Sequence, residues 1–184
     1  MDFLFIDAKY SGKVELTKET LTYCKKYKVL ALYASIQFSS QLEAIIKQLK
    51  EAKIMVITSQ PERTNSKFQI LGCDLSYQNL KLDEKPDAFL YIGDGIFQPT
   101  ALVLAQKDEK EFKEVITFDP IAKKLSSLGL DNIEKILKKY KGSFLKFLHS
   151  ENIGVIITLK SGQQQFNPSK LLKEKYPNKN FYYF

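Results

Sequence analysis

Three stretches of the chain place polar or reactive side chains directly after apolar runs. They are centred on Cys73, on Gly93-Asp94-Gly95 and on Gln163-Gln164-Gln165. In parallel α/β sheets, ligands bind in the loops that follow the carboxyl ends of the strands. The sequence therefore predicts that these three loops are candidate ligand-binding positions.

Cys73 is the candidate with the most distinctive chemistry. It stands between Gly72 and Asp74, a loop context that favours an exposed thiol. A lone cysteine is also compatible with a structural role, because free cysteine packs like a small hydrophobic residue. That structural interpretation applies more strongly to Cys24, which is expected on a helix beside Lys25. No CxxC pair is present, so a metal site built by this chain alone would lack soft ligands.

The other two loops each allow two interpretations. Gly93-Asp94-Gly95 is either a tight turn alone or a place where the backbone approaches a ligand closely while Asp94 accepts hydrogen bonds. No dinucleotide or P-loop pattern accompanies it. Gln163, Gln164 and Gln165 precede an expected helix, whose amides could hold a carboxylate, or they form a solvated loop.

Histidine chemistry is restricted to one residue. His149 is the sole histidine, and it is expected at the end of a basic helix, as a surface or capping residue. A Ser-His-Asp or Cys-His arrangement would depend on it entirely, which argues against a hydrolase.

The elements that must position these loops alternate along the chain. Short apolar runs are followed by longer stretches with helical spacing, which predicts an α/β fold with a parallel, Rossmann-like sheet. Strands are expected at 3–6, 28–33, 53–58, 88–92, 114–118, 153–158 and 180–184. Helices are expected at 15–26, 39–52, 100–106, 131–150 and 167–175. Ser39 or Ser40 is the expected cap of the second helix.

A joint is expected between Ser126 and Leu130. It divides the chain into an α/β domain at 1–127 and a partial α/β unit at 128–184.

Composition narrows the classes of partner. The formal net charge is +7, and Arg63 is the only arginine, so the basic surface consists of lysines. Lysine lacks the bidentate geometry that reads bases, which argues against specific nucleic-acid binding and for a solvated surface. Two cysteines, no signal segment and no membrane-length apolar run predict a cytoplasmic protein.

Four segments together resemble the diphthamide-synthase family. They are Ile70-Leu71-Gly72-Cys73, the stretch from Asp87 to Phe97 with Gly93-Asp94-Gly95, then Phe118-Asp119-Pro120, and Gly154 to Leu159 with the glutamine-rich loop. Their order and spacing are similar to the family pattern over roughly residues 28–184.

The resemblance implies a specific chemistry. Family members are expected to place three similar α/β domains around a 4Fe–4S cluster, with one cysteine from each domain. The cluster binds S-adenosylmethionine, and a 3-amino-3-carboxypropyl radical then adds to a histidine of elongation factor 2. Three thiolates leave one iron open for the substrate. By this resemblance, Cys73 matches the ligand of the middle domain, and the rest of the chain resembles the start of the C-terminal domain.

The chain also departs from the family pattern. Nothing resembles the first domain, Gln98 replaces a histidine, and the glutamine-rich loop lacks its arginine. With one matching cysteine, a cluster requires a partner chain, because even a homo-oligomer with two copies of Cys73 remains one thiolate short. The alternatives are a non-catalytic relative acting as a binding or scaffold module, and a protein that binds S-adenosylmethionine without a cluster.

Overall fold

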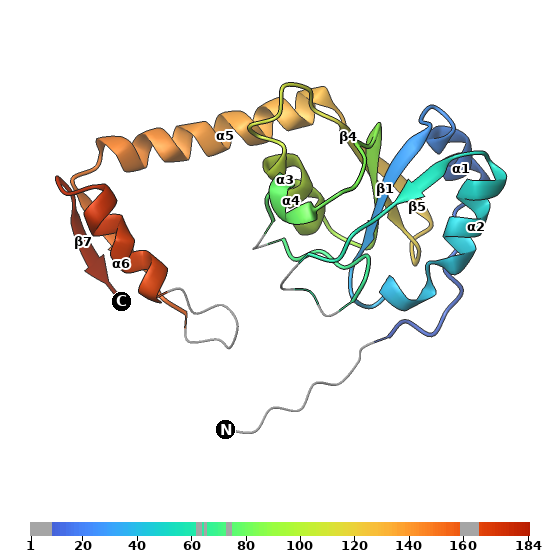
Figure 1. Cartoon of the computed structure of the whole chain (residues 1–184), viewed down its shortest axis with the longest axis horizontal. Coiled ribbons are helices and arrows are strands. Elements are labelled where there is room, and N and C mark those ends of the chain that lie inside the picture. Colours follow the sequence, from blue (N-terminus) through green and yellow to red (C-terminus); the bar gives the residue numbers. More distant parts are fainter. Residues whose placement is uncertain (1–8, 62–63, 65, 73–74, 159–165) are drawn as a thin grey trace, which may run out of the picture. The chain divides into compact units, whose positions relative to one another are not determined.

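A five-stranded sheet forms the centre of the first part of the chain (Figure 1). The computed structural model describes residues 9–61, 64, 66–72, 75–158 and 166–184. The strand order is β2-β1-β3-β4-β5, and all neighbours are parallel except β4 and β5. The strands are β1 (Val29–Ala34), β2 (Met55–Ile57), β3 (Ala88–Ile92), β4 (Glu114–Asp119) and β5 (Lys124–Leu128). The predicted mostly parallel α/β fold is confirmed.

The two central strands are buried along nearly their whole length. β1 pairs with β3 from Leu30 and Ala88 to Ala34 and Ile92. Alternate side chains of each strand enter two separate core clusters, one on each face of the sheet. Such continuous apolar runs are typical of strands covered on both faces.

Helices supply the covering layers. Residues of α1 (Lys18–Cys24) and α2 (Glu43–Glu51) belong to or border one core cluster, as do Phe38 and Leu42 on either side of η1 (Ser39–Gln41). Residues of α3 (Tyr77–Leu80), α4 (Phe97–Ala105) and the first turns of α5 (Leu130–His149) belong to or border the other. No helix within the described ranges combines the length and the apolar composition required to cross a bilayer.

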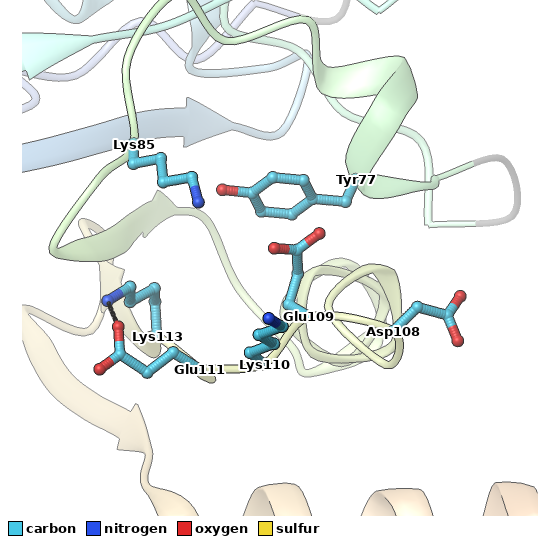
Figure 2. A pocket seen from close by; sticks show the side chains of 7 residues that line it. All are labelled: Tyr77, Lys85, Asp108, Glu109, Lys110, Glu111 and Lys113. Carbon is cyan, nitrogen blue, oxygen red and sulfur yellow. Dashed lines mark hydrogen bonds and ion pairs between the residues drawn. The ribbon is translucent and has the colours of Figure 1, made fainter.

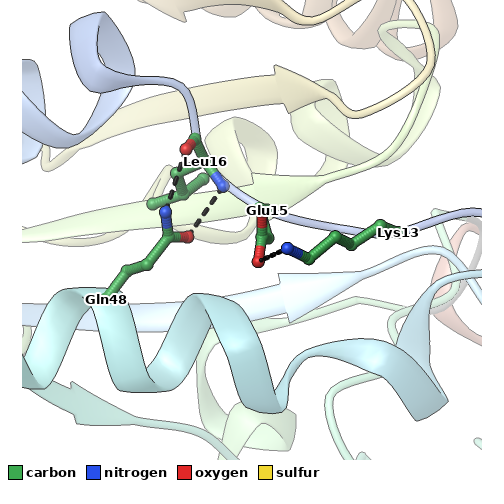
Figure 3. Close-up of polar contacts among 4 residues, drawn as sticks. All are labelled: Lys13, Glu15, Leu16 and Gln48. Atoms are coloured by element: carbon green, nitrogen blue, oxygen red, sulfur yellow. Dashed lines mark hydrogen bonds and ion pairs between the residues drawn. The ribbon is translucent and has the colours of Figure 1, made fainter.

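A side chain of α2 holds the extended segment that leads into α1 (Figure 3). The Gln48 side chain accepts a hydrogen bond from the Leu16 N–H at 2.8 Å and donates one to the Leu16 carbonyl at 3.0 Å. On the same segment, Lys13 and Glu15 form an exposed ion pair at 2.6 Å. The paired amide bonds satisfy both backbone groups of Leu16, which itself is buried.

Two helix starts differ from the sequence prediction. The Thr17 hydroxyl accepts a hydrogen bond from the Thr20 N–H at 3.2 Å, so α1 begins at Lys18 and not at residue 15. The predicted serine cap of the second helix is wrong. The Ser39 hydroxyl instead donates to the Ile36 carbonyl at 3.0 Å, and a 3₁₀ turn leads into α2.

The expected joint at Ser126 to Leu130 is also wrong in its first part, because β5 extends to Leu128. The Asp119 carboxylate accepts the N–H groups of Ile121 and Ala122 at 2.8 and 3.0 Å, which fixes the turn after β4. The chain then reverses, and β5 runs antiparallel to β4.

The chain divides into two compact units inside α5, between Leu137 and Lys138. The domain boundary near residue 128 stays a prediction. The second unit contains β6 (Asn152–Val155), α6 (Phe166–Lys175) and β7 (Asn180–Tyr183), and β6 and β7 pair in parallel. The Lys179 ammonium donates to the carbonyls of Leu148 and Ser150 at 2.7 and 2.6 Å, which caps the end of α5.

Candidate functional site

The loop that leads toward Cys73 runs along the carboxyl end of β1. Ala34 forms a parallel bridge with Gln69, and its N–H donates to the Phe68 carbonyl at 2.8 Å. Ile70 is buried in the core cluster on one face of the sheet. The segment 68–72 is therefore anchored beside the end of a central strand.

Gly72 and Phe97 bring two of the predicted loops together. A Cβ atom built on Gly72 would lie 2.6 Å from Cε1 of Phe97, closer than two such carbons can approach. Phe97 begins α4, directly after the Gly93-Asp94-Gly95 turn and Ile96. Glycine at position 72 thus allows the aromatic ring that follows one motif to pack on the backbone of the other.

Neighbouring contacts and backbone conformation account for the two glycines of the Gly93-Asp94-Gly95 turn. The Gly93 N–H donates to the Phe118 carbonyl at 3.0 Å, which joins the turn to the end of β4. A Cβ on Gly93 would lie 2.7 Å from the Tyr91 hydroxyl oxygen. Gly95 has a φ of +69°, in the left-handed region that favours glycine. Asp94, between them, is exposed.

Two buried hydroxyls lie at the same end of the sheet. Neither the Ser35 nor the Tyr91 hydroxyl has a hydrogen-bond partner of normal geometry among the described residues. Burial raises the pKa of Tyr91 to about 12, while the nearby Ser35 hydroxyl opposes the shift and the Asp94 charge adds to it. Ser35, Tyr91 and Asp94 are therefore close enough to interact at the ends of β1 and β3.

This end of the sheet carries groups suited to a polar ligand. Asp94 offers an exposed carboxylate, the turn offers backbone that a ligand can approach, and the two hydroxyls retain unused hydrogen-bonding capacity. The sequence did not predict the hydroxyls as site residues. The available signal was position: Ser35 directly follows a buried strand, at the end where ligands bind in such sheets.

The sequence matches a protein family over its whole length. Residues 1–184 match the family model described as "Putative diphthamide synthesis protein". The chain belongs to the diphthamide synthesis family. The predicted resemblance is thereby confirmed, and the contact between the Leu71-Gly72 segment and the Phe97 that follows the glycine-rich turn is a property of this family member.

Curated relatives of this family member are longer. The 2-(3-amino-3-carboxypropyl)histidine synthase of Pyrococcus horikoshii is 30% identical over 133 residues, which cover 68% of this chain and 35% of that protein. Subunit 1 of the human 2-(3-amino-3-carboxypropyl)histidine synthase is 30% identical over 131 residues, which cover 71% of this chain and 27% of the human protein.

Solved structures of similar fold are also longer than this chain. The crystal structure of Dph2 from Pyrococcus horikoshii superposes with a TM-score of 0.73 and 26% identity, over 91% of this chain and 47% of Dph2. The structure of that protein with a 4Fe–4S cluster gives a TM-score of 0.74 at 23% identity, over 94% of this chain and 49% of the neighbour. The second comparison supports the shared fold.

The structure describes some of the remaining predicted site residues and not others. Cys73 and Gln163, Gln164 and Gln165 lie outside the described residues. Gly93, Asp94 and Gly95 follow β3, as predicted. His149 is exposed at the end of α5, as expected for a surface residue.

Cys24 is confirmed as a structural cysteine. It is fully buried at the end of α1, and burial, followed by the charge of Glu114, raises the pKa of its thiol to about 12. A metal ligand must be a thiolate, which this environment disfavours. Among the described residues, no three His, Cys, Asp or Glu side chains cluster in a way that could hold a metal ion.

Asp87, the first residue of one family motif, has a structural role. Its carboxylate accepts the N–H groups of Lys28 and Val29 at 2.8 and 2.9 Å, and these two bonds lower its pKa. The carboxylate therefore joins the starts of β1 and β3. These amino ends of the strands lie opposite the carboxyl ends that carry the candidate site.

A pocket of about 610 Å³ lies at this amino end of the strands (Figure 2). Lys85 precedes β3 and Lys113 precedes β4, so the pocket opens at the amino ends of these strands. Lys113 is paired with Glu111 at 2.7 Å. The pocket is lined by side chains of both charges and one tyrosine: Tyr77, Lys85, Asp108, Glu109, Lys110, Glu111 and Lys113. Volume alone therefore does not identify the functional end of this sheet.

Proposed function

We propose that this family member contributes to diphthamide formation by supplying one thiolate, Cys73, to a 4Fe–4S cluster shared with a partner chain. The observation that carries the proposal is the contact between Gly72 and Phe97. Gly72 lies against the ring of Phe97, which follows the Gly93-Asp94-Gly95 turn, and Cys73 is the next residue in the sequence. Parallel α/β sheets bind their ligands at this end of the strands.

The fit to a cluster is partial for this chain alone. Cys24 is excluded by its burial and by the raised pKa of its thiol, so Cys73 is the single cysteine suited to binding iron. A cluster with one open iron takes three protein thiolates. The remaining two are therefore assigned to a partner chain.

The chain's own residues would act on the substrate, S-adenosylmethionine. When bound, the cluster supplies the open iron that holds the sulfonium compound. Asp94 is an exposed carboxylate suited to accepting hydrogen bonds from an ammonium group. The turn at Gly93 and Gly95 allows the ligand to approach the backbone, and Gln163, Gln164 and Gln165 offer further amide groups.

The product class follows from the family. The curated relatives carry the name 2-(3-amino-3-carboxypropyl)histidine synthase. We extend this activity to the present chain: transfer of a 3-amino-3-carboxypropyl group to a histidine of elongation factor 2, in the cytoplasm. The chain spans 35% of the length of the Pyrococcus relative. The requirement for a partner chain is part of the same proposal.

The experiment is an iron–sulfur test with two matched cysteine variants. The tagged chain is purified without oxygen from its native cell, together with whatever binds it, and is reconstituted with iron and sulfide. A visible absorption band is expected in the wild type and in Cys24→Ser, and it should disappear in Cys73→Ala. A band that persists in Cys73→Ala contradicts the assignment of this ligand.

A non-catalytic role as a binding or scaffold module is the second candidate. It is favoured by the cysteine count, because Cys73 is the one cysteine that matches a ligand of the family pattern. A colourless wild-type preparation that still retains its partner supports this role. Calorimetry separates a third case: binding of S-adenosylmethionine that is equal in the wild type and in Cys73→Ala indicates a site that works without a cluster.

A further inference from the structure

The two faces of the β6–β7 sheet differ in exposure. On one face, Ile153, Val155 and Phe181 are half-buried, and Tyr183 is 37% exposed. On the other, residues of the two neighbouring segments are all exposed, and we call this set the outer β6–β7 face. It consists of Asn152, Gly154, Ile156, Asn180, Tyr182 and Phe184.

The register brings the outer residues together. Asn180 pairs with Asn152, and Tyr182 pairs with Gly154. A Cβ on Gly154 would lie 3.7 Å from the Phe184 ring, so this ring lies over the glycine. The exposed fractions are 88% for Ile156, 53% for Tyr182 and 78% for Phe184. Three large apolar side chains therefore share one uncovered surface.

Such a surface is unusual for parallel strands. Parallel sheets occur almost only where both faces are covered, commonly by helices. A contiguous exposed apolar patch with polar neighbours marks an interaction site more often than ordinary surface. Asn152 and Asn180 supply polar neighbours, and their side chains hydrogen-bond to each other at 3.1 Å.

The net charge of the second unit indicates the charge that a protein partner of this face would carry. Residues 138–184 contain nine lysines and two acidic residues, whereas residues 1–137 contain 19 basic and 19 acidic residues. The whole net charge of +7 therefore belongs to the second unit. A protein partner with an acidic surface would be attracted to this unit over long range.

We propose that the outer β6–β7 face binds the apolar side of an acidic helix from a partner protein. Neighbouring strands lie about 4.8 Å apart and alternate residues about 7 Å apart, a spacing that the apolar stripe of one helix can cover. The inference rests on the proposed function only in requiring a partner chain. It assigns the docking surface and the charge of that chain, independently of any cluster.

Two other occupants fit the surface less well. A second copy would bring two units of the same +7 charge together. A nucleic acid would match the charge and could stack bases on Tyr182 and Phe184, but Ile156, the most exposed of the three side chains, offers no ring, and lysines alone give no bidentate contacts. Both are outcomes of the experiment.

The experiment uses the full chain in its native cell. A photo-reactive benzoylphenylalanine replaces Tyr182, and cross-linked peptides are identified by mass spectrometry. Support requires a cross-link to a helical segment with an apolar stripe and net negative charge. Combined substitution Ile156→Ser, Phe184→Ser should lower the yield at least about tenfold. Ile121→Ser, which changes an isoleucine of 60% exposure in the first unit, should leave it unchanged.

A defined probe supplies the second measurement. A synthetic acidic amphipathic peptide, long enough at about 20 residues to form a helix, is titrated against the purified chain by fluorescence anisotropy. Binding should weaken at least about tenfold between about 50 and about 500 mM salt and in the serine variant. Stronger binding of a poly(U) RNA of equal length overturns the proposal, as do cross-links to RNA or to a second copy, and as does an unchanged cross-link yield in the serine variant.

Failure here is separable from failure of the proposed function. Cys73→Ala should abolish the absorption band while leaving the cross-link at position 182 intact. A retained band in the serine variant with an unchanged cross-link would leave the cluster assignment standing and reject the docking surface.

Discussion

Two parallel strand pairs in this chain have opposite surroundings. β1 and β3 are buried on both faces between two core clusters, and their backbone bonds are paired on both edges. β6 and β7 have one face that is half-buried except at Tyr183 and one face that is exposed. The chain passes through α2, β2 and α3 between β1 and β3, and through α6 between β6 and β7. What differs is how many layers cover the strands.

The comparison separates two ways of using a sheet. In the first unit, both faces of the central strands are buried, and the candidate site is built on the strand ends at Ser35 and Gly93. In the second unit, the exposed face itself is the feature available for interaction. The charge follows the same division, since the first unit is neutral and the second carries +7.

The largest expected contrast comes from deleting one aromatic ring in each sheet. Phe89 of β3 is fully buried beside Tyr33, with ring centroids 6.5 Å apart, whereas Phe184 is 78% exposed. Phe89→Ala should destabilise the first unit by about 3–5 kcal/mol. Phe184→Ala should change stability by less than about 0.5 kcal/mol. Urea unfolding followed by circular dichroism measures both, and equal effects would refute the difference in coverage.

A second contrast replaces one glycine in each sheet. In Gly93→Ala the new methyl meets the buried Tyr91 hydroxyl at 2.7 Å, so overpacking should cost about 1–3 kcal/mol. In Gly154→Ala the methyl meets the Phe184 ring at 3.7 Å, an ordinary contact, and removing a strand glycine should stabilise by about 0.5–1 kcal/mol. Thermal unfolding should therefore shift in opposite directions. A shift of the same sign in both variants contradicts the assigned packing.

Sequence predicted the fold where a local signal and the tertiary environment agree. The continuous apolar runs at β1 and β3 and the long amphipathic pattern of α5 were recognised for that reason. β5 was missed because Lys124 to Leu128 contains two serines and forms a strand only by pairing with β4. The start of α1 was misplaced because the cap at Thr17 was not recognised.

The candidate site was predictable to a similar extent. The position of Gly93, Asp94 and Gly95 at a strand end followed from the apolar run before them. The contact of Gly72 with Phe97 was not predictable, because it depends on how two loops far apart in sequence return to one edge of the sheet. The unpartnered hydroxyls of Ser35 and Tyr91 are likewise visible only in three dimensions.

A smaller effect should be confined to the second unit. Lys179 donates to two carbonyls at the end of α5, and its ammonium lies 5.3 Å from the centre of the Phe147 ring. Lys179→Met keeps much of the apolar stem but removes both bonds, which should cost about 1 kcal/mol. Lys173→Met, which removes the same charge from α6, is the control. Amide hydrogen exchange should accelerate at the end of α5 in the first variant and remain unchanged in the control.

The smallest expected effect concerns pH in the first unit. Backbone N–H groups of Val29 and Lys28 lower the pKa of Asp87 below its ordinary value of 3.8. A carboxylate with a lowered folded-state pKa stabilises the fold above the unfolded-state pKa, and this contribution disappears as the pH falls through the folded-state pKa. Because Asp87 is exposed, solvent screening limits the contribution to about 0.5 kcal/mol.

Asp87→Asn should therefore be less stable than the wild type at neutral pH, and the two should begin to converge as the pH falls below about 3.8. Asp83→Asn, at an exposed carboxylate nearby, provides the control for the loss of one negative charge. Urea midpoints measured from neutral pH down to pH 3 test the difference. A gap between Asp87→Asn and wild type that persists or widens in acid would show that the carboxylate does not stabilise the joined starts of β1 and β3 through its charge.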